Sequence, residues 1–192
     1  MMSLVAAAGL LASGLAGQIV PETLALPSVK TVDGGTFALG GRSATVLVFL
    51  THQCPIANDY QPTLGRLAQD FAKDGVAVLG VHIDPTLSAA DAKAHAKEYR
   101  ISYALFVDRE HKLVAQFRPK VTPEAVVIDG KGKVRYQGRI NDLYPEIGVR
   151  RKEAKTQDLR EAIAAVVAGK PVKTPRTDAV GCLIPDLKDF GS

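Results

Sequence analysis

The chain is short of cysteine, aromatic residues and strong net charge, and each shortage excludes a class of protein. Its 192 residues include two cysteines, four histidines and no tryptophan, which excludes a disulfide-dense small scaffold and a zinc finger. The formal net charge is only +4, and no known nucleic-acid-binding pattern accompanies the dispersed basic residues, so we expect no nucleic-acid partner. The hydrophobic content of 46% excludes disorder as the main state and is enough for one domain.

The beginning of the chain differs in composition from the rest. Residues 1–17 contain no charged side chain, and residues 4–16 form an apolar run as long as the core of a signal peptide. Small residues at its end suit a signal peptidase, although no lysine or arginine precedes the run. We expect residues 1–20 to be a signal peptide or an N-terminal membrane anchor, with a packed helix as the alternative. Export would place the protein in the periplasm or another oxidising, extracytoplasmic compartment.

Beyond residue 20 the pattern alternates between strands and helices. Continuous apolar, β-branched runs indicate strands that are buried on both faces, as in parallel sheets. The expected elements are a hairpin at 29–39, strands at 45–50, 76–83, 104–107, 125–128 and 133–136, and helices at 62–71, 88–99 and 156–168. Ser88 and Thr156 are the expected helix caps. We therefore predict one α/β domain over residues 21–170, a central mixed β-sheet flanked by helices, followed by a tail at residues 171–192 that carries Cys182.

The first cysteine stands where a buried strand ends and a helix begins. Free amide groups and the dipole at a helix N-terminus stabilise a thiolate, so we expect the pKa of Cys54 to be lowered. Pro55 fits the first helical position, where its missing amide hydrogen costs nothing. Pro123 directly precedes another buried strand, a position where proline is tolerated. These placements predict that Cys54 is a reactive nucleophile.

Three segments together resemble the thioredoxin-like redoxins. They are the hairpin DGGTFALGG at residues 33–41, THQCP at 51–55 and TPEAVVID at 122–129. This group includes the alkyl hydroperoxide reductase/thiol-specific antioxidant proteins and exported thiol–disulfide oxidoreductases. The resemblance, which covers residues 24–168, implies a thioredoxin-like fold and a thiol-dependent oxidoreductase supplied by an external thiol reductant. We expect no cofactor.

The resemblance also implies roles for particular residues. Pro123 would follow a cis peptide bond and lie beside the Cys54 sulfur. Thr122 would offer its backbone to a substrate in extended conformation. Thr51 would orient a peroxide for attack by Cys54, as in peroxiredoxins.

Two departures from the family patterns leave the substrate open. Thioredoxin-type enzymes use Cys-x-x-Cys, but Ala57 stands where the second cysteine would be. Peroxiredoxins carry a proline where this chain has Leu47, and an arginine near the threonine–proline pair, where only Arg118 is close in sequence. Peroxide and protein disulfides both remain open as substrates, with a slight preference for the antioxidant activity.

The second cysteine lies in a tail rich in turn-forming residues, which could swing toward the site. Three interpretations stay open for Cys182. It could resolve or pair with an oxidised Cys54, it could be a free or intermolecular thiol, or it could ligate a metal. A bond to Cys54, 128 residues away, would close a very long loop.

A metal site is the basis of the alternative function. His52, Cys54 and His82 are expected near one end of the sheet, and cysteine with histidine suits a soft ion such as Cu(I). The alternative is therefore a non-enzymatic, exported thioredoxin-like module that binds copper or docks a partner. His95 and His111 are expected to face solvent instead.

Two carboxylates and one loop complete the candidates. Asp59 and Asp84 are expected near the site and could relay protons to or from Cys54. Asp84 precedes a proline and equally fits a turn. The loop at residues 141–155 is long for a connection, so it could pack over the sheet edge or form a partner surface.

Overall fold

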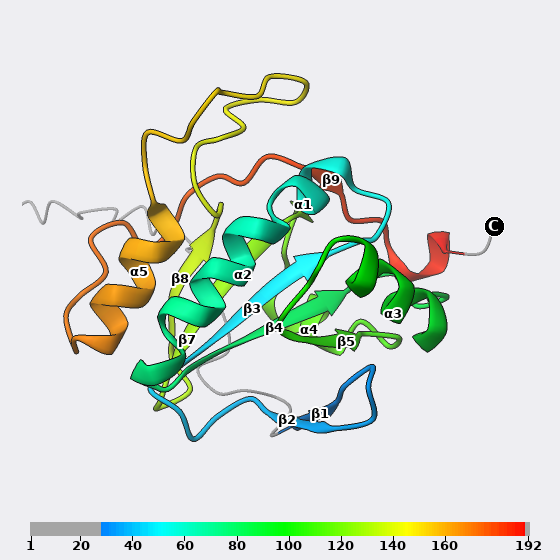
Figure 1. The fold of residues 1–192 in the computed structure, drawn as a ribbon, viewed down its shortest axis with the longest axis horizontal. Coiled ribbons are helices and arrows are strands. Elements are labelled where there is room, and N and C mark those ends of the chain that lie inside the picture. The colour runs from blue at the N-terminus through cyan, green and yellow to red at the C-terminus, as the bar shows by residue number, and fades with distance from the viewer. Residues whose placement is uncertain (1–27, 191–192) are drawn as a thin grey trace, which may run out of the picture.

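A computed structural model describes residues 28–190, and its centre is a five-stranded mixed sheet (Figure 1). The strands of this sheet are β3 (Ala44–Leu50), β4 (Val76–His82), β5 (Ala104–Val107), β7 (Glu124–Asp129) and β8 (Val134–Gly138). Their order is β5-β4-β3-β7-β8, where β3, β4 and β5 run parallel and β7 is antiparallel to both β3 and β8.

The remaining elements surround this sheet. The α-helices are α1 (Pro55–Asp59), α2 (Gln61–Asp70), α3 (Ala89–Glu98), α4 (Lys112–Phe117) and α5 (Asp158–Val167). Two short 3₁₀ helices are η1 (Ala72–Asp74) and η2 (Leu187–Asp189). Two small antiparallel pairs complete the fold, a hairpin of β1 (Ser28–Lys30) with β2 (Thr36–Ala38), and β6 (Val121–Thr122) with β9 (Cys182–Leu183).

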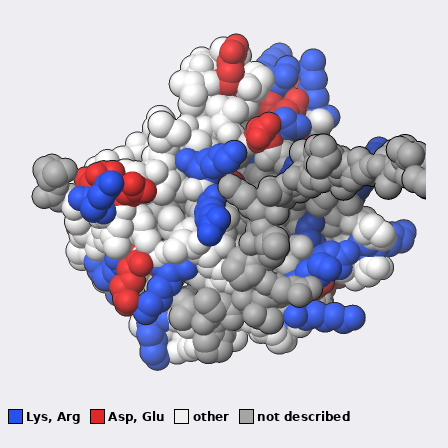
Figure 2. All heavy atoms as spheres, turned by 180° about the vertical axis from the view of Figure 1, so that it is seen from behind, with Lys and Arg blue, Asp and Glu red and all other residues white. Residues whose placement is uncertain are grey.

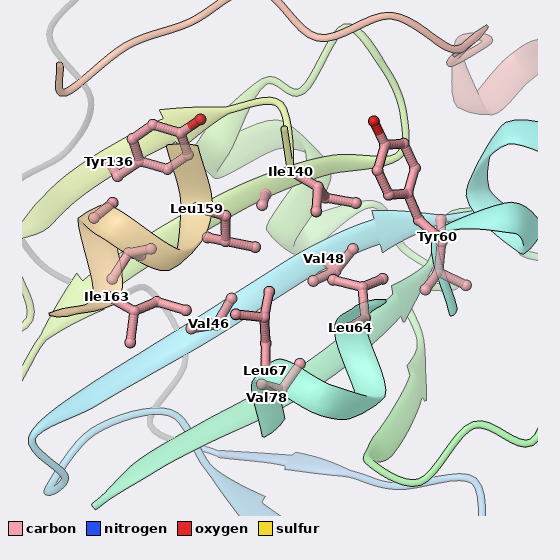
Figure 3. Close-up of a cluster of buried hydrophobic side chains, with 14 of the residues drawn as sticks. Val46, Val48, Tyr60, Leu64, Leu67, Val78, Tyr136, Ile140, Leu159 and Ile163 are labelled. Carbon is pink, nitrogen blue, oxygen red and sulfur yellow. The ribbon is translucent and has the colours of Figure 1, made fainter. Parts of the chain in front are cut away.

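Strand β3 is buried on both faces and separates two apolar cores. Because alternate side chains of a strand point to opposite faces, Val46 and Val48 join one core, while Leu47 and Phe49 join the other. The first core lies between the sheet and helices α1, α2 and α5, as Figure 3 shows for its larger members. The second is covered by α4 and the β1–β2 hairpin. The α/β architecture with a central mixed sheet and flanking helices is therefore as predicted.

Most predicted elements are present, and their ends differ by one or two residues. The hairpin, the five strands and the helices at α2, α3 and α5 all occur in the expected order. Ser88 caps α3 as expected, since its Oγ accepts the amide hydrogen of Asp91 at 3.0 Å. The predicted Thr156 cap is wrong, because α5 begins at Asp158 with Gln157 at the cap position, and the Thr156 hydroxyl donates to the Asp158 carboxylate instead of accepting an amide hydrogen of the helix.

Helix α4 was not predicted from the sequence. Its six residues are too few to show a helical period, and its stability comes from a residue that precedes it. Both carboxylate oxygens of the buried Asp108 accept amide hydrogens from the first turn of the helix, at 2.8 to 2.9 Å. These bonds satisfy donors that a helix N-terminus otherwise leaves free.

The tail is docked against the domain in this structure, where β9 pairs with β6. Within residues 28–190, no helix is long and apolar enough to cross a bilayer. The expected signal peptide or membrane anchor at residues 1–20 lies outside the described residues. Lysine and arginine side chains are interspersed with acidic ones over the described part of one face, rather than gathered in one patch (Figure 2).

Candidate active site

Cys54 lies in the turn that joins β3 to α1, and its side chain is fully buried. Its amide donates to the Thr51 carbonyl at 3.2 Å, so Thr51 shapes this turn through its backbone. Cys54 is also the residue that caps α1, because its sulfur accepts the amide hydrogen of Ala57 at 3.5 Å. The expected position at a helix N-terminus is therefore present, and the sulfur replaces the usual oxygen cap.

Thr122, the residue before Pro123, lies directly against this sulfur. The Thr122–Pro123 peptide bond is cis, as the family resemblance implied. The Cys54 thiol donates to the carbonyl oxygen of Thr122 at 3.1 Å, across 68 residues of sequence. Thr122 is fully buried, and its backbone pairs with β9.

Cys182 arrives at the same point from the tail. In the β6–β9 pair it lies opposite Thr122, and its thiol donates to the Cys54 sulfur at 2.7 Å. Both cysteines are free thiols here. The structure thus brings Cys54, Cys182, Thr122 and Pro123 together, while Thr51 touches Cys54 through its carbonyl alone.

The two thiols differ in acidity because their surroundings differ. Burial raises the pKa of Cys54, but hydrogen bonds from Cys182 and from the Ala57 amide outweigh burial and leave this pKa below its usual range. Burial and the hydrogen bond to Cys54 raise the pKa of Cys182 to about 12. Cys54 is therefore the more acidic of the two thiols, and Cys182 is the one that keeps its proton.

A group of three histidines lies beside this centre. The rings of His82 and His95 are 5.2 Å apart between centroids, and those of His52 and His95 are 6.3 Å apart. Asn58 from α1 joins them, since its Oδ1 lies 2.8 Å from Nε2 of His95 and its Nδ2 donates to the His52 carbonyl. His82 is fully buried and neither ring nitrogen has a hydrogen-bond partner. Burial, followed by the repulsion of His95, lowers the pKa of His82 to about 3, so its ring is neutral.

Two expectations about histidine are wrong. His95 and His111 are buried rather than solvent-facing. His95 lies on the buried side of α3, and Nε2 of His111 is 2.6 Å from the Ile83 carbonyl oxygen. The copper set of His52, Cys54 and His82 is not assembled either. Among the residues that the structure describes, no three His, Cys, Asp or Glu side chains are placed to hold a metal ion.

The two candidate proton-relay carboxylates are engaged elsewhere. Asp59 accepts from the Tyr144 hydroxyl and from Nε of Arg150, both at 2.7 Å, and the Arg150 hydrogen bond is the main reason that its pKa is lowered. Asp84 accepts from the Thr86 amide at 2.9 Å, as the turn interpretation requires. The contacts of Asp59 join the long loop at residues 141–155 to helix α1.

Two residues that shape the site were not singled out by sequence reasoning. Asn58 bridges His52 and His95, and nothing in its sequence context indicates this. Gly181 lies so close to Thr122 that a Cβ built on it would be 2.0 Å from the Thr122 carbonyl oxygen. The signal available in the sequence was that Gly181 directly precedes Cys182, the second cysteine of the chain.

Comparison with known proteins identifies sequences similar to this chain. The model of the AhpC/TSA family matches residues 17–137, more than half of the chain. The thiol-disulfide oxidoreductase YkuV of Bacillus subtilis is 26% identical over 99 residues. That match spans 50% of this chain and 66%, just under two thirds, of that relative.

Solved structures confirm the thioredoxin-like fold. A hypothetical protein of Sinorhizobium meliloti 1021 superposes with a TM-score of 0.73 at 25% identity, over 85% of this chain and 92% of that one. A secreted disulfide oxidoreductase of Mycobacterium tuberculosis, described as homologous to DsbE of E. coli, superposes with a TM-score of 0.53 at 21% identity. The second match covers 72% of this chain and 94% of the other. Further similar structures are thiol–disulfide interchange proteins.

Proposed function

Because this chain belongs to the AhpC/TSA family, we propose that it is a thiol–disulfide oxidoreductase in which Cys54 is the nucleophile and Cys182 the resolving cysteine. The observation that carries the proposal is the contact of 2.7 Å between two sulfurs that are 128 residues apart in sequence. Cys182 would then take the part of the second cysteine that Cys-x-x-Cys enzymes have at the position of Ala57.

The exchange proceeds in two balanced steps. The Cys54 thiolate attacks one sulfur of a substrate disulfide, forms a mixed disulfide with it and releases the other sulfur as a thiolate. Cys182 then loses its proton, attacks the Cys54 sulfur and releases the first substrate sulfur. The substrate gains two electrons, and the protein is left with a Cys54–Cys182 disulfide. An external dithiol returns the pair to its reduced form by the same chemistry.

The difference in acidity supports this order of events. A lowered pKa keeps Cys54 available as a thiolate, whereas Cys182 at a pKa of about 12 stays protonated while Cys54 is charged. Once Cys54 is bound in a mixed disulfide its charge is gone, and this cause of the raised pKa of Cys182 disappears. The first step thus removes the part of the raised pKa of Cys182 that Cys54 causes, while burial still acts on this thiol.

We favour protein disulfides over peroxide as substrate. Among the described residues, the hydrogen-bond partners of the Cys54 sulfur are Thr122, Ala57 and Cys182, and none of them is a cation that would polarise a peroxide. The sulfur also lies against a strand edge, where a peptide can be bound through its backbone. YkuV and the mycobacterial neighbour carry the same activity in their names.

We also propose an extracytoplasmic location. The composition of residues 1–20 supports export, and the mycobacterial structural neighbour is a secreted protein. A pair of cysteines that cycles through a disulfide is compatible with an oxidising compartment.

Turnover of a disulfide-bonded peptide with dithiothreitol as reductant tests the proposal. We expect Cys54→Ala to abolish turnover. When dithiothreitol is left out, Cys182→Ser should stop after one exchange, with the peptide attached to Cys54, because no second thiol is present to release it. Leu183→Ala, one residue away and 82% exposed, should keep full activity. Turnover by Cys54→Ala would overturn the proposal. A rate with hydrogen peroxide far above the disulfide rate would refute the substrate assignment and leave the cysteine roles intact.

A further inference from the structure

Residues 180–184 cross the active site as an extended strand. Thr122 pairs with Cys182 and Val121 with Leu183, and the Ile184 amide donates to the Lys120 carbonyl at 3.2 Å. Figure 1 shows this red segment passing beside α1. The chain's own tail therefore lies on the strand edge that contains Thr122, as a bound peptide would.

This segment is held at both ends. On its N-terminal side, the Thr177 hydroxyl is 2.7 Å from the Tyr136 hydroxyl and accepts the Arg139 amide hydrogen at 3.0 Å. On its C-terminal side, the Phe190 ring packs against His111, with 5.5 Å between centroids. The part between these anchors can leave β6 while the rest of the tail stays attached.

The docked segment closes the site. Cys54 and Thr122 have no exposed surface, and Cys182 lies directly on the Cys54 sulfur. A protein substrate reaches Cys54 after residues 180–184 have moved off β6. Substrate and tail consequently compete for the same strand edge.

The tail also shows what that edge selects. A Cβ at position 181 would lie 2.0 Å from the Thr122 carbonyl oxygen and 2.6 Å from its carbon, so the residue before the cysteine has no room for a side chain. Leu183, the residue after the cysteine, is 82% exposed and is therefore not selected by contact. The strand edge therefore restricts side-chain size at one position of the bound segment, the residue before the cysteine.

We infer that residues 180–184 are a built-in competitor of the substrate, and that the substrate is an extended peptide segment whose reactive cysteine is directly preceded by glycine. This inference rests on the proposed function, because it names the substrate that Cys54 attacks. Thr122 is then the residue that determines specificity, through the position of its carbonyl group. The tail regulates access until a matching segment displaces it.

Peptides that carry a good leaving group test this selectivity. The Cys182→Ser protein is mixed with Val-Gly-Cys-Leu-Ile, Val-Ala-Cys-Leu-Ile or Val-Gly-Cys-Ala-Ile, each with its cysteine joined to thionitrobenzoate. Cys54 attacks the peptide sulfur, a new disulfide forms, and the coloured thionitrobenzoate anion leaves. We expect the alanine-before-cysteine peptide to react about tenfold more slowly or worse, since a side chain there overpacks the site. The peptide changed after the cysteine should react within about twofold of the first, since solvent surrounds that position.

The results separate this inference from the proposed function. Equal rates for the glycine and alanine peptides would overturn the inference while leaving the cysteine chemistry in place. The inference also fails if no peptide reacts faster than free cysteine carrying the same leaving group. If Cys54 reacts with none of these reagents, the proposed function fails first.

A second variant tests the competition itself. In the Cys182→Ser background, Gly181→Val should push the segment off β6 and raise the rate of Cys54 alkylation by iodoacetamide at least about tenfold, because burial no longer protects the thiol. Leu183→Ala in the same background is the matched control and should leave the rate unchanged. An unchanged rate for Gly181→Val, with the circular dichroism spectrum intact, would show that the tail does not close the site.

Discussion

At the scale of single residues, the two thiols of the site differ in acidity because one donates a hydrogen bond to the other. Cys182 donates to Cys54, so the donor is stabilised as a thiol and the acceptor as a thiolate. The Ala57 amide is a second hydrogen-bond donor to the Cys54 sulfur. This hydrogen bond does not depend on the redox state of the tail. The acidity of the nucleophile is thus set partly by a residue on a different segment.

Removing that donor should make Cys54 less acidic. Cys182→Ala loses the largest of the contributions that lower the pKa of Cys54, while the burial that raises it remains. We expect the midpoint of the pH profile for Cys54 alkylation to move to higher pH, which reduces the thiolate fraction near neutral pH. Leu183→Ala serves as the control. Easier access would change the plateau rate and not the midpoint, so an unmoved midpoint would contradict the assigned hydrogen bond.

His82 is fully buried, and neither of its ring nitrogens has a hydrogen-bond partner. Its pKa of about 3 lies below the ordinary value of 6.5, so the unfolded chain binds a proton that the folded protein rejects. Stability should therefore fall as the pH drops from about 6.5 toward 3, by up to about 1.4 kcal/mol per pH unit. His82→Leu removes two unpaired nitrogens, and we expect it to be neutral or stabilising at pH 7 and less sensitive to acid.

Urea unfolding across this pH range measures the effect of His82. His111→Leu is the comparison, since its ring nitrogen is paired with the Ile83 carbonyl oxygen and its loss should destabilise the fold at pH 7. Equal acid sensitivity of His82→Leu and the unmodified protein would contradict the account of His82.

At the scale of elements, the long loop at residues 141–155 is fastened by two aspartates of different burial. Asp142 is buried and accepts amide hydrogens from Lys155 and Thr156 at 2.7 and 2.9 Å, which fixes the approach to α5. Asp59 holds the other side of the loop through Arg150, in a partly exposed ion pair. The loop packs against α1 and α5 through these contacts.

The two aspartates should therefore contribute unequally to stability. Asp142→Ala leaves the part-buried amide bonds of Lys155 and Thr156 without an acceptor and should lower the free energy of unfolding by about 1–3 kcal/mol. Asp59→Ala removes a partly exposed pair and should cost less than about 1 kcal/mol. Denaturant titration of both variants checks the order, and a larger loss for Asp59→Ala would be evidence against it.

The elements also show which signals a sequence carries. Strand β3 could be predicted because both of its faces are buried, which leaves a continuous apolar run. Helix α4 could not be predicted, because six residues are too few to show a helical period and because the stability of this helix depends on the side chain of Asp108. The exposure of His95 was predicted wrongly because it depends on how α3 packs against His82, a contact between distant segments.

At the scale of the whole molecule, the central feature is the path of the tail. The fold brings the end of the chain back across the cis-proline turn, so that a strand of two residues carries Cys182 to Cys54. The sequence predicts each cysteine's local setting, but no local pattern encodes a contact across 128 residues. A disulfide at this point would close a very long loop. In a chain-entropy estimate, this cross-link would stabilise the folded protein by about 4 to 5 kcal/mol.

The most direct test of the account is a non-reducing peptide map, with intact mass, of the protein before and after one equivalent of a disulfide oxidant. The account predicts a loss of two hydrogens, a Cys54–Cys182 linkage in the map, and full reversal by dithiothreitol. Cys182→Ser should show no internal linkage and should carry the oxidant on Cys54 instead. If Cys54 stays a free thiol, or is oxidised while Cys182 remains reduced in every molecule, the paired-cysteine account is contradicted.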